Sequence, residues 1–211
     1  MTLISLTDVQ KSYADRLVLR SVSVSAKAGD VVGVLGANGS GKSTLMRIIA
    51  GVLRADCGSV ELVVNGTSVS EAHRPFVCGY VAPYLNLYDE FSSRELLAMH
   101  AHLHRQSITS ENVEELLHRV GLDRRMDDVV KTFSSGMRQR VAIALAVSLN
   151  PSLLLLDEPS TNLDTEGRTI LANEIRSHRQ RGGIVFLATN DERERVLCTQ
   201  SVSVSPLEQP Q

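Results

Sequence analysis

A glycine-rich loop between an apolar run and a helical stretch constrains this chain more than any other segment. The loop is residues 36–44, GANGSGKST, and it follows residues 31–35, whose length and β-branching are typical of a buried strand. Residues 45–50 contain no helix breaker until Gly51, so they predict a helix. Strand, glycine-rich loop and helix in this order form the context that the pattern G-x-x-x-x-G-K-[ST] requires for phosphate binding.

The residue types in the loop follow from the chemistry of phosphate binding. Backbone N–H groups can wrap a polyphosphate only where no Cβ intrudes, which explains the loop's three glycines. The helix that begins here points its positive end at the phosphates. Lys42 can reach the β- and γ-phosphates, and the Ser43 hydroxyl can ligate Mg²⁺. We therefore predict a nucleotide site with these residues: Gly36, Asn38, Gly39, Ser40, Gly41, Lys42, Ser43 and Thr44.

The composition fits one domain with a substantial core. The chain has 211 residues, of which 43% are apolar. Its formal charge is -2 and its pI about 6.3, so the charge balance predicts no nucleic-acid partner. The longest apolar stretches, such as residues 141–147, are far shorter than the roughly 20 residues of a membrane-spanning helix. With no signal-peptide pattern at the N-terminus, we expect a cytoplasmic protein that docks on a membrane partner.

Strand and helix patterns alternate along most of the chain, which predicts an α/β fold with a mainly parallel sheet. The expected strands are residues 3–9, 18–26, 59–64, 76–82, 153–158, 184–188 and, at an edge, 202–204. The first two alternate apolar and polar residues around a turn and predict an N-terminal antiparallel subdomain. Long helices are expected over residues 138–149 and 165–181.

Residues 84–131 differ from the rest because strand signals vanish there. Ser92 and Glu95 form a capping box ahead of a helix that runs to residue 104. Ser110 is the expected N-cap of a second helix, which runs through Val120. We interpret this segment as a helical lobe inserted into a single domain, residues 1–211.

Two further segments carry chemistry. Residues 153–158 are an apolar strand that ends in Asp157 and Glu158, and ligands of open α/β sheets bind beyond the carboxyl ends of the strands. Successive strand residues point opposite ways, so one carboxylate is expected to hold Mg²⁺ and the other to orient or deprotonate a water. Residues 133–137, FSSGM, begin a helix whose hydroxyls and free N–H groups can face an anion, with Ser134 as its N-cap.

Phosphate loop, serine-rich helix start and acidic strand, in this order, resemble the ATP-binding subunit of an ABC transporter over nearly the whole chain. The resemblance implies an α/β P-loop NTPase core and ATP hydrolysis with ATP and Mg²⁺ as ligands. It implies that Tyr13 stacks on adenine, that Asp157 serves Mg²⁺ and that Glu158 is the catalytic carboxylate.

The same resemblance implies an assembly of several subunits. Residues 133–137 would be the signature motif, in which Ser134, Ser135 and Gly136 contact the γ-phosphate of ATP held by a second copy. Two ATP molecules would lie between two head-to-tail copies or a pseudo-dimer, and residues 160–164 would cross the interface. The helical lobe would receive a short helix of a transmembrane permease subunit, which places the protein on the inner face of the membrane. Leu87 and Phe91 are the candidates for that groove.

Two positions depart from the family pattern. The glutamine that usually follows the Pro of a Gly-Tyr-x-x-Pro stretch is Tyr84 here, and the histidine that usually follows the last core strand is Asn190. Asparagine donates a hydrogen bond but carries no positive charge, so it stabilises less charge in the transition state. We expect hydrolysis that is slow, and a nucleotide-gated module with little turnover stays open as an alternative.

The transported substrate is not encoded in these motifs. Residues 133–140, FSSGMRQR, together with the polar stretch from Asn190 to Cys198, are similar to compact exporter ATPases such as the haem exporter of cytochrome c maturation. A soluble ABC protein of repair or translation is a second alternative, but such proteins usually carry two cassettes or a long coiled-coil insertion. His100 and His104 share a helix face and could hold a metal or contact haem, but without a third ligand a solvated or interfacial face is favoured.

Overall fold

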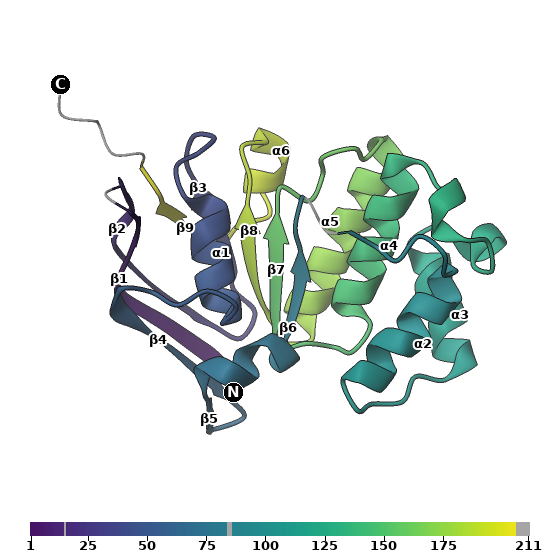
Figure 1. Cartoon of the computed structure of the whole chain (residues 1–211), viewed down its shortest axis with the longest axis horizontal. Helices are drawn as coiled ribbons and strands as arrows, with labels where there is room; N and C mark the ends of the chain where they lie inside the picture. The colour runs from purple at the N-terminus through teal and green to yellow at the C-terminus, as the bar shows by residue number, and fades with distance from the viewer. Residues whose placement is uncertain (15, 84–85, 206–211) are drawn as a thin grey trace.

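The computed structural model describes residues 1–14, 16–83 and 86–205, and in it the chain forms two sheets with helices between and beside them (Figure 1). The larger sheet is parallel throughout and has the strand order β6-β7-β8-β3-β9. Its strands are β3 (Val31–Leu35), β6 (Cys78–Val81), β7 (Leu153–Asp157), β8 (Ile184–Ala188) and β9 (Gln200–Ser203). Within the described ranges, no helix combines the length and apolar character that crossing a bilayer requires.

The central strands of this sheet are apolar without interruption because both of their faces are covered. In β7, Leu154 and Leu156 face a core that the larger helices share, whereas Leu153 and Leu155 face a second core. β8 divides its residues between the two cores in the same alternating way. This arrangement is expected of parallel sheets, which carry helices on their faces.

The smaller sheet is antiparallel, with the order β2-β1-β4-β5. Its strands are β1 (Leu3–Tyr13), β2 (Arg16–Lys27), β4 (Cys57–Val64) and β5 (Thr67–Val69), and Asn65 and Gly66 form the tight turn before β5. Helix α1 (Lys42–Ala50) lies between the two sheets and fills the second core (Figure 1). The predicted antiparallel subdomain and parallel core are thus both confirmed.

The remaining helices cover the other face of the parallel sheet (Figure 1). They are α2 (Ser93–Leu103), α3 (Ser110–Arg119), α4 (Ser135–Val147) and α5 (Thr165–Gln180), with a short α6 (Glu192–Arg195) after β8. α4 packs on β6 and α5 on β8, while α2 and α3 pack on α4. The described part of the chain also contains the 3₁₀ turns η1 (Glu71–Val77), η2 (Asp123–Arg125) and η3 (Val130–Thr132).

Several predicted boundaries differ from the structure. The expected strand over residues 76–82 starts only at Cys78, because the two residues before it belong to η1. The N-cap of α3 is Thr109 rather than Ser110, since the Thr109 hydroxyl accepts from the Asn112 N–H at 3.2 Å. The predicted capping box at Ser92 is present with both of its hydrogen bonds. Helix α6 was not predicted, and a helix of four residues has too little periodicity to be recognised.

Candidate nucleotide-binding site

The glycine-rich loop packs tightly between the end of β9 and strand β2. A Cβ on Gly36 would lie 2.1 Å from the Val204 carbonyl oxygen, so no other residue fits there without moving the backbone. Gly41 has a φ of +105°, and a Cβ on it would lie 2.9 Å from side chains of Val18 and Leu19. Ser40 and Thr44 are buried, whereas Asn38 and Gly39 are exposed at the tip of the loop. The loop is therefore positioned by both sheets.

Lys42 connects this loop to the acidic end of β7. Its side chain is only 5% exposed, and its ammonium group donates to the carbonyl oxygens of Gly36 at 2.8 Å and Ala37 at 3.2 Å. A Glu158 carboxylate oxygen lies 3.6 Å from the Lys42 Nζ and supplies a counter-charge. A buried ammonium group needs such partners because desolvation penalises its charge.

Asp157, the last residue of β7, is a buried carboxylate. It is 1% exposed, and neither of its oxygens bonds to any group among the described residues. Burial raises its pKa, and the nearby Ser43 hydroxyl partly offsets that effect. An unpaired buried carboxylate is costly unless a cation neutralises it. Carboxylate and hydroxyl oxygens are ligands that suit Mg²⁺, which takes one or two protein ligands and completes its shell with phosphates and water.

Glu158 has an unusual backbone conformation. Its φ is +48°, which non-glycine residues rarely adopt, and its N–H donates to the Ala188 carbonyl oxygen of β8 at 2.8 Å. Because β7 ends at Asp157, the different environments of the two carboxylates come from this turn and not from strand alternation as predicted. The Glu158 side chain is 37% exposed, whereas Asp157 is buried, so Glu158 is the carboxylate better placed to orient a water.

Asn190 lies against the phosphate loop. Its side-chain amide is 2.8 Å from the Asn38 side chain. When the amide nitrogen and oxygen of Asn190 are placed so that each has a partner, the nitrogen donates to the Gly36 carbonyl oxygen at 2.7 Å and the oxygen accepts from the Lys42 Nζ at 3.2 Å. The turn after β8 is capped by the next residue, Asp191, whose carboxylate accepts from the Arg193 N–H. Asn190 is therefore not occupied with capping that turn.

Tyr13 lies at the end of β1, on the hairpin whose second strand touches the phosphate loop. Its ring is 46% exposed, and the Lys11 ammonium lies 5.9 Å from the ring centroid. Lys11 is held in turn by Asp56 at 2.6 Å. An exposed aromatic face beside a phosphate site is suited to stacking on a base.

The serine-rich helix start lies apart from these groups. Ser134 is the N-cap of α4, where its hydroxyl accepts from the Met137 N–H at 3.2 Å, and it is exposed together with Ser135. A Cβ on Gly136 would lie 2.9 Å from the Asn162 carbonyl oxygen. Among the hydrogen bonds and ion pairs of the described residues, none joins residues 133–137 to the phosphate loop.

Two neighbouring residues of α4 were missed by the sequence reasoning. Gln139 donates to the Pro159 carbonyl oxygen at 2.8 Å, and Arg140, 8% exposed, donates to Asp164 at 2.9 Å. Both partners lie at least 20 residues further along the chain, so no local pattern could have indicated them. Tyr84, where the family pattern has glutamine, lies outside the described residues.

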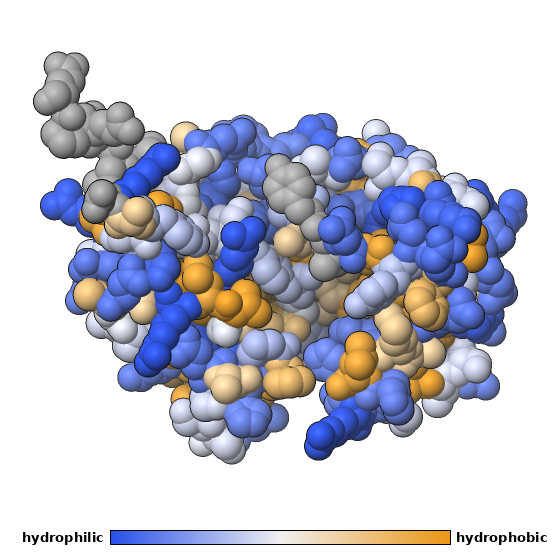
Figure 2. Space-filling model, in the orientation of Figure 1, coloured by the Kyte–Doolittle hydropathy of each residue, from blue (hydrophilic) through white to orange (hydrophobic). Residues whose placement is uncertain are grey.

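An apolar groove lies between β6 and α2, away from the phosphate loop. It has a volume of about 240 Å³ and a mainly apolar lining, including Tyr80, Leu87, Met99, His100, Leu103 and Leu145. Figure 2 shows apolar side chains over this part of the surface. Tyr88 also lines the groove, and Phe91 extends the apolar surface beside it, with the two ring centroids 6.2 Å apart.

His100 of α2 lines this groove, and His104 follows at the C-cap of the same helix. The rings of His100 and His104 lie with centroids 4.5 Å apart, and the His100 Nδ1 is 3.1 Å from the Ser148 hydroxyl. Burial lowers the pKa of His100 to about 4, which keeps it neutral near pH 7. Among the described residues, no group of three or more His, Cys, Asp or Glu side chains could hold a metal.

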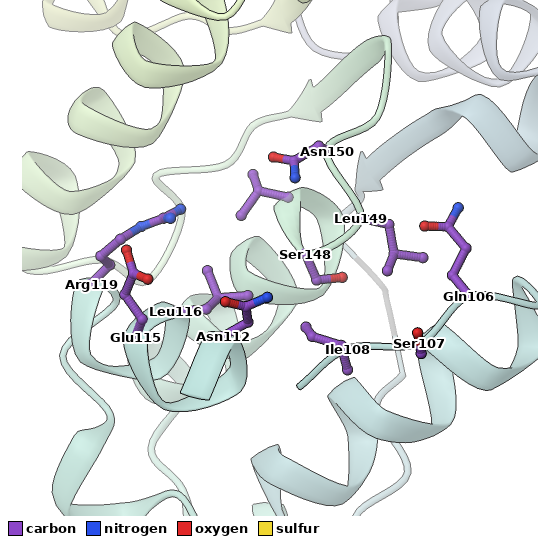
Figure 3. A pocket seen from close by; sticks show the side chains of 11 residues that line it. Gln106, Ser107, Ile108, Asn112, Glu115, Leu116, Arg119, Ser148, Leu149 and Asn150 are labelled. Carbon is purple, nitrogen blue, oxygen red and sulfur yellow. The ribbon is translucent and has the colours of Figure 1, made fainter. Parts of the chain in front are cut away.

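A more polar pocket of about 310 Å³ lies between the end of α2, helix α3 and the end of α4 (Figure 3). Gln106 and Glu115 line it together with Arg119. The Arg119 guanidinium is already paired with the buried Glu174 carboxylate through two hydrogen bonds, of 2.6 and 3.0 Å. None of the predicted site residues lines this pocket, so it is separate from the candidate nucleotide site.

Residues 19–161 match the protein family described as ABC transporter. The "Uncharacterized ABC transporter ATP-binding protein YdbJ" of Bacillus subtilis (strain 168) is 35% identical over 189 residues, which cover 88% of this chain and 60% of that protein. The "Nod factor export ATP-binding protein I" of Rhizobium meliloti (strain 1021) is 35% identical over 199 residues, covering 92% and 59%. The chain thus spans about 60% of the length of these two relatives.

Solved structures have the same fold. One is described as the ATP-binding subunit of an ABC transporter and superposes with a TM-score of 0.83 at 25% identity, covering 97% of this chain and 88% of that one. Another, a dimeric post-hydrolysis state of an ATP-binding cassette bound to ADP and Pi, has a TM-score of 0.83 at 22% identity and covers 97% of each chain.

Proposed function

The chain belongs to the ABC transporter family, whose ATP-binding domains are ATPases, and on this premise we propose that it hydrolyses ATP to drive transport through separate membrane subunits. One observation carries the proposal. Lys42, Asp157 and Glu158 converge at the carboxyl ends of parallel strands, where α/β sheets bind their ligands. A buried cation next to an unpaired buried carboxylate suits a phosphate chain with its metal ion.

In this proposal the loop and its neighbouring residues have different roles in binding and hydrolysing ATP. The loop's N–H groups and Lys42 bind the β- and γ-phosphates, while Ser43 and Asp157 hold Mg²⁺. When bound, Mg²⁺ neutralises charge on the phosphate oxygens. A phosphate at Lys42 takes over the ion pair that Glu158 makes in this structure, which frees the carboxylate to orient a water and accept its proton. Asn190 donates a neutral hydrogen bond to the γ-phosphate.

We propose further that two copies, or one copy and a similar subunit, pair head to tail around two ATP molecules. Ser134 and Ser135 are exposed and have no hydrogen bond to their own phosphate loop, so they are free to contact nucleotide on another subunit. Gly136 sits at a helix N-terminus, where backbone N–H groups favour an anion. Tyr13 is proposed to stack on the adenine of its own subunit.

Binding and hydrolysis of ATP test this function. The parent chain is expected to bind Mg–ATP in a titration and to release phosphate, and Lys42→Ala to lose both because the buried charge at the loop is gone. Lys27→Ala, which removes an exposed lysine at the end of β2, is the matched control and should behave like the parent. A folded Lys42→Ala variant with parental affinity and turnover would contradict the assignment.

The membrane partner is proposed to insert a short helix into the apolar groove between β6 and α2. Exposed apolar patches mark partner sites, and Leu87 lines this groove while Phe91 lies beside it. In this arrangement the protein is cytoplasmic and peripheral on the inner face of the membrane.

Sedimentation with membranes tests the docking site. Leu87→Glu combined with Phe91→Glu should abolish binding to washed membranes of the source cell, because charges replace the apolar contact. Val196→Glu is the control, since Val196 is 81% exposed on a different helix terminus. Parental sedimentation of the double variant would place the docking site elsewhere, and equal binding to vesicles of extracted lipid would exclude a protein partner.

The substrate is proposed only as a class. The sequence of residues 133–140 and the stretch from Asn190 to Cys198 support an exporter of the compact haem-exporter type. A nucleotide-gated module with little turnover is the second candidate, favoured by the neutral Asn190 where the family pattern has a histidine. Steady-state turnover with and without membrane subunits separates these two functions.

A further inference from the structure

The segment that follows Glu158 is hydrogen-bonded to helix α4. The Gln139 side-chain nitrogen of α4 donates to the Pro159 carbonyl oxygen at 2.8 Å. One turn earlier in α4, Gly136 lies so close to this segment that a Cβ would come within 2.9 Å of the Asn162 carbonyl oxygen. The start of α4 and residues 159–162 therefore form one packed unit.

This hydrogen bond lies next to the reacting carboxylate. Pro159 follows Glu158 directly, and the Glu158 backbone is held in its left-handed conformation by the bond from its N–H to Ala188. That bond fixes Glu158 from the side of β8, whereas Gln139 fixes the Pro159–Ser160 peptide, one residue further on, from the side of α4. A conformation at φ +48° is costly and persists only where the surroundings hold it on both sides.

The neighbouring residue holds the other end of the same segment. Arg140 donates to Asp164, the N-cap of α5, at 2.9 Å and to Glu166 at 3.3 Å. Arg140 is buried and makes both of these hydrogen bonds, so its removal would lose packing as well as the two bonds and disturb the fold generally. Gln139 is neutral and half-buried, so its hydrogen bond can be removed with less disturbance.

We propose that Gln139 is a positioning residue that couples the two ATP sites of the dimer. This inference rests on the proposed function, in which residues 134–136 contact the partner's ATP while Glu158 acts on the ATP of its own subunit. A shift of α4 caused by the partner's nucleotide reaches Pro159 through the Gln139 amide and moves Glu158 into or out of line with the attacking water. The contact is directional, because Gln139 can donate to the carbonyl oxygen and Pro159 has no N–H to offer in return.

Two variants of nearly equal size test the inference. Gln139→Met removes the donor but keeps the length and the helix propensity, and Gln139→Glu replaces the donor by a charged acceptor facing a carbonyl oxygen. We expect kcat to fall about three- to ten-fold for Met, the loss of one neutral hydrogen bond, and at least as far for Glu. KM for ATP, ATP affinity and the thermal midpoint should stay at parental values.

Controls separate this inference from the function on which it rests. Gln180→Glu makes the same chemical change at an exposed position at the end of α5 and should leave kcat unchanged. If the parent and Lys42→Ala show the same ATP binding and turnover, the proposed function has failed. If these two differ but both Gln139 variants hydrolyse at the parental rate, the coupling role is wrong. A parallel loss of ATP affinity and thermal midpoint would instead make Gln139 a structural residue and overturn the proposal.

Discussion

The phosphate loop and the start of α4 are built in different ways, although both are helix N-termini suited to an anion. Around the loop, Glu158 from the turn after β7 and Asn190 from the turn after β8 converge on Lys42, which is only 5% exposed. At the start of α4, Ser134 is exposed, and among the described residues its hydrogen bonds stay within its own helix. The side chains around the phosphate loop therefore contact one another within one chain, whereas the start of α4 exposes a surface that another molecule can contact.

The difference also concerns strain and charge. The loop region contains the left-handed Glu158 and the buried Asp157, whose carboxylate has no hydrogen-bond partner among the described residues, and both cost free energy in the isolated chain. The start of α4 is a capped helix end without such costs. The strain and charge at the phosphate loop support a site that binds a nucleotide with its metal ion. The unstrained, exposed start of α4 supports a surface that contacts a second subunit.

Glu158→Gln gives the largest expected effect and tests the first region. The amide cannot accept a proton from water, so hydrolysis should fall on the order of a hundred- to ten-thousand-fold. ATP affinity should stay or rise, because the change removes a negative charge beside the phosphates. Phosphate release and ATP titration measure the two effects.

The same variant shows whether the two regions meet across an interface. With hydrolysis blocked, ATP should hold the head-to-tail dimer, seen as a doubled mass in light scattering. Glu61→Gln, on exposed β4, is the matched control and should hydrolyse like the parent. A variant that hydrolyses normally would remove Glu158 from the mechanism, and one that cannot bind ATP would give it a structural role.

The two regions also differ in how far the sequence predicts them. The cap at Ser134, the capping box at Ser92 and the strand–loop–helix unit of residues 31–50 were predicted because each is encoded by residues close in the chain. The left-handed turn at Glu158 and the Gln139–Pro159 bond were not, since they depend on packing between distant segments. Local chemistry predicted the components of the candidate site, and tertiary contacts decided their geometry.

Substitutions of Asn190 give the next largest expected effect, and they test whether this side chain contributes to hydrolysis at the phosphate loop. Its amide contacts the loop at Asn38, so Asn190→Ala removes the donor that we propose faces the γ-phosphate. By analogy with lost oxyanion donors, kcat should fall roughly ten-fold to a few hundred-fold. Asn190→His should preserve or raise kcat, because a protonated imidazole makes a stronger, charge-assisted hydrogen bond.

The turn after β8 offers a control for Asn190. Asp191 caps α6 and pairs with Arg168, so Asp191→Asn should affect stability more than chemistry. The measurements are kcat for the three variants and ATP affinity measured separately. An Ala variant with parental kcat would reduce Asn190 to a turn residue and leave Glu158 as the only side chain assigned to the attacking water.

Ser134 gives the smallest effect on the chain itself and the sharpest test of the second region. Ser134→Ala removes the acceptor for the Met137 N–H, and the loss of an N-cap should lower the free energy of unfolding by about 1 kcal/mol. Ser134→Asp keeps an acceptor there, and its charge is favourable at a helix N-terminus, so stability in a urea titration should return to near the parental value.

If Ser134 serves only its own helix, the Asp variant should therefore behave like the parent in every assay. If its exposed face meets the γ-phosphate on a second subunit, the added carboxylate repels that phosphate. In the Glu158→Gln background, the ATP-dependent dimer should then weaken more for Asp than for Ala, which reverses the order of the two stabilities. Light scattering with ATP measures the dimer, and equal dimerisation of the Asp variant and the parent would leave Ser134 as a helix cap alone.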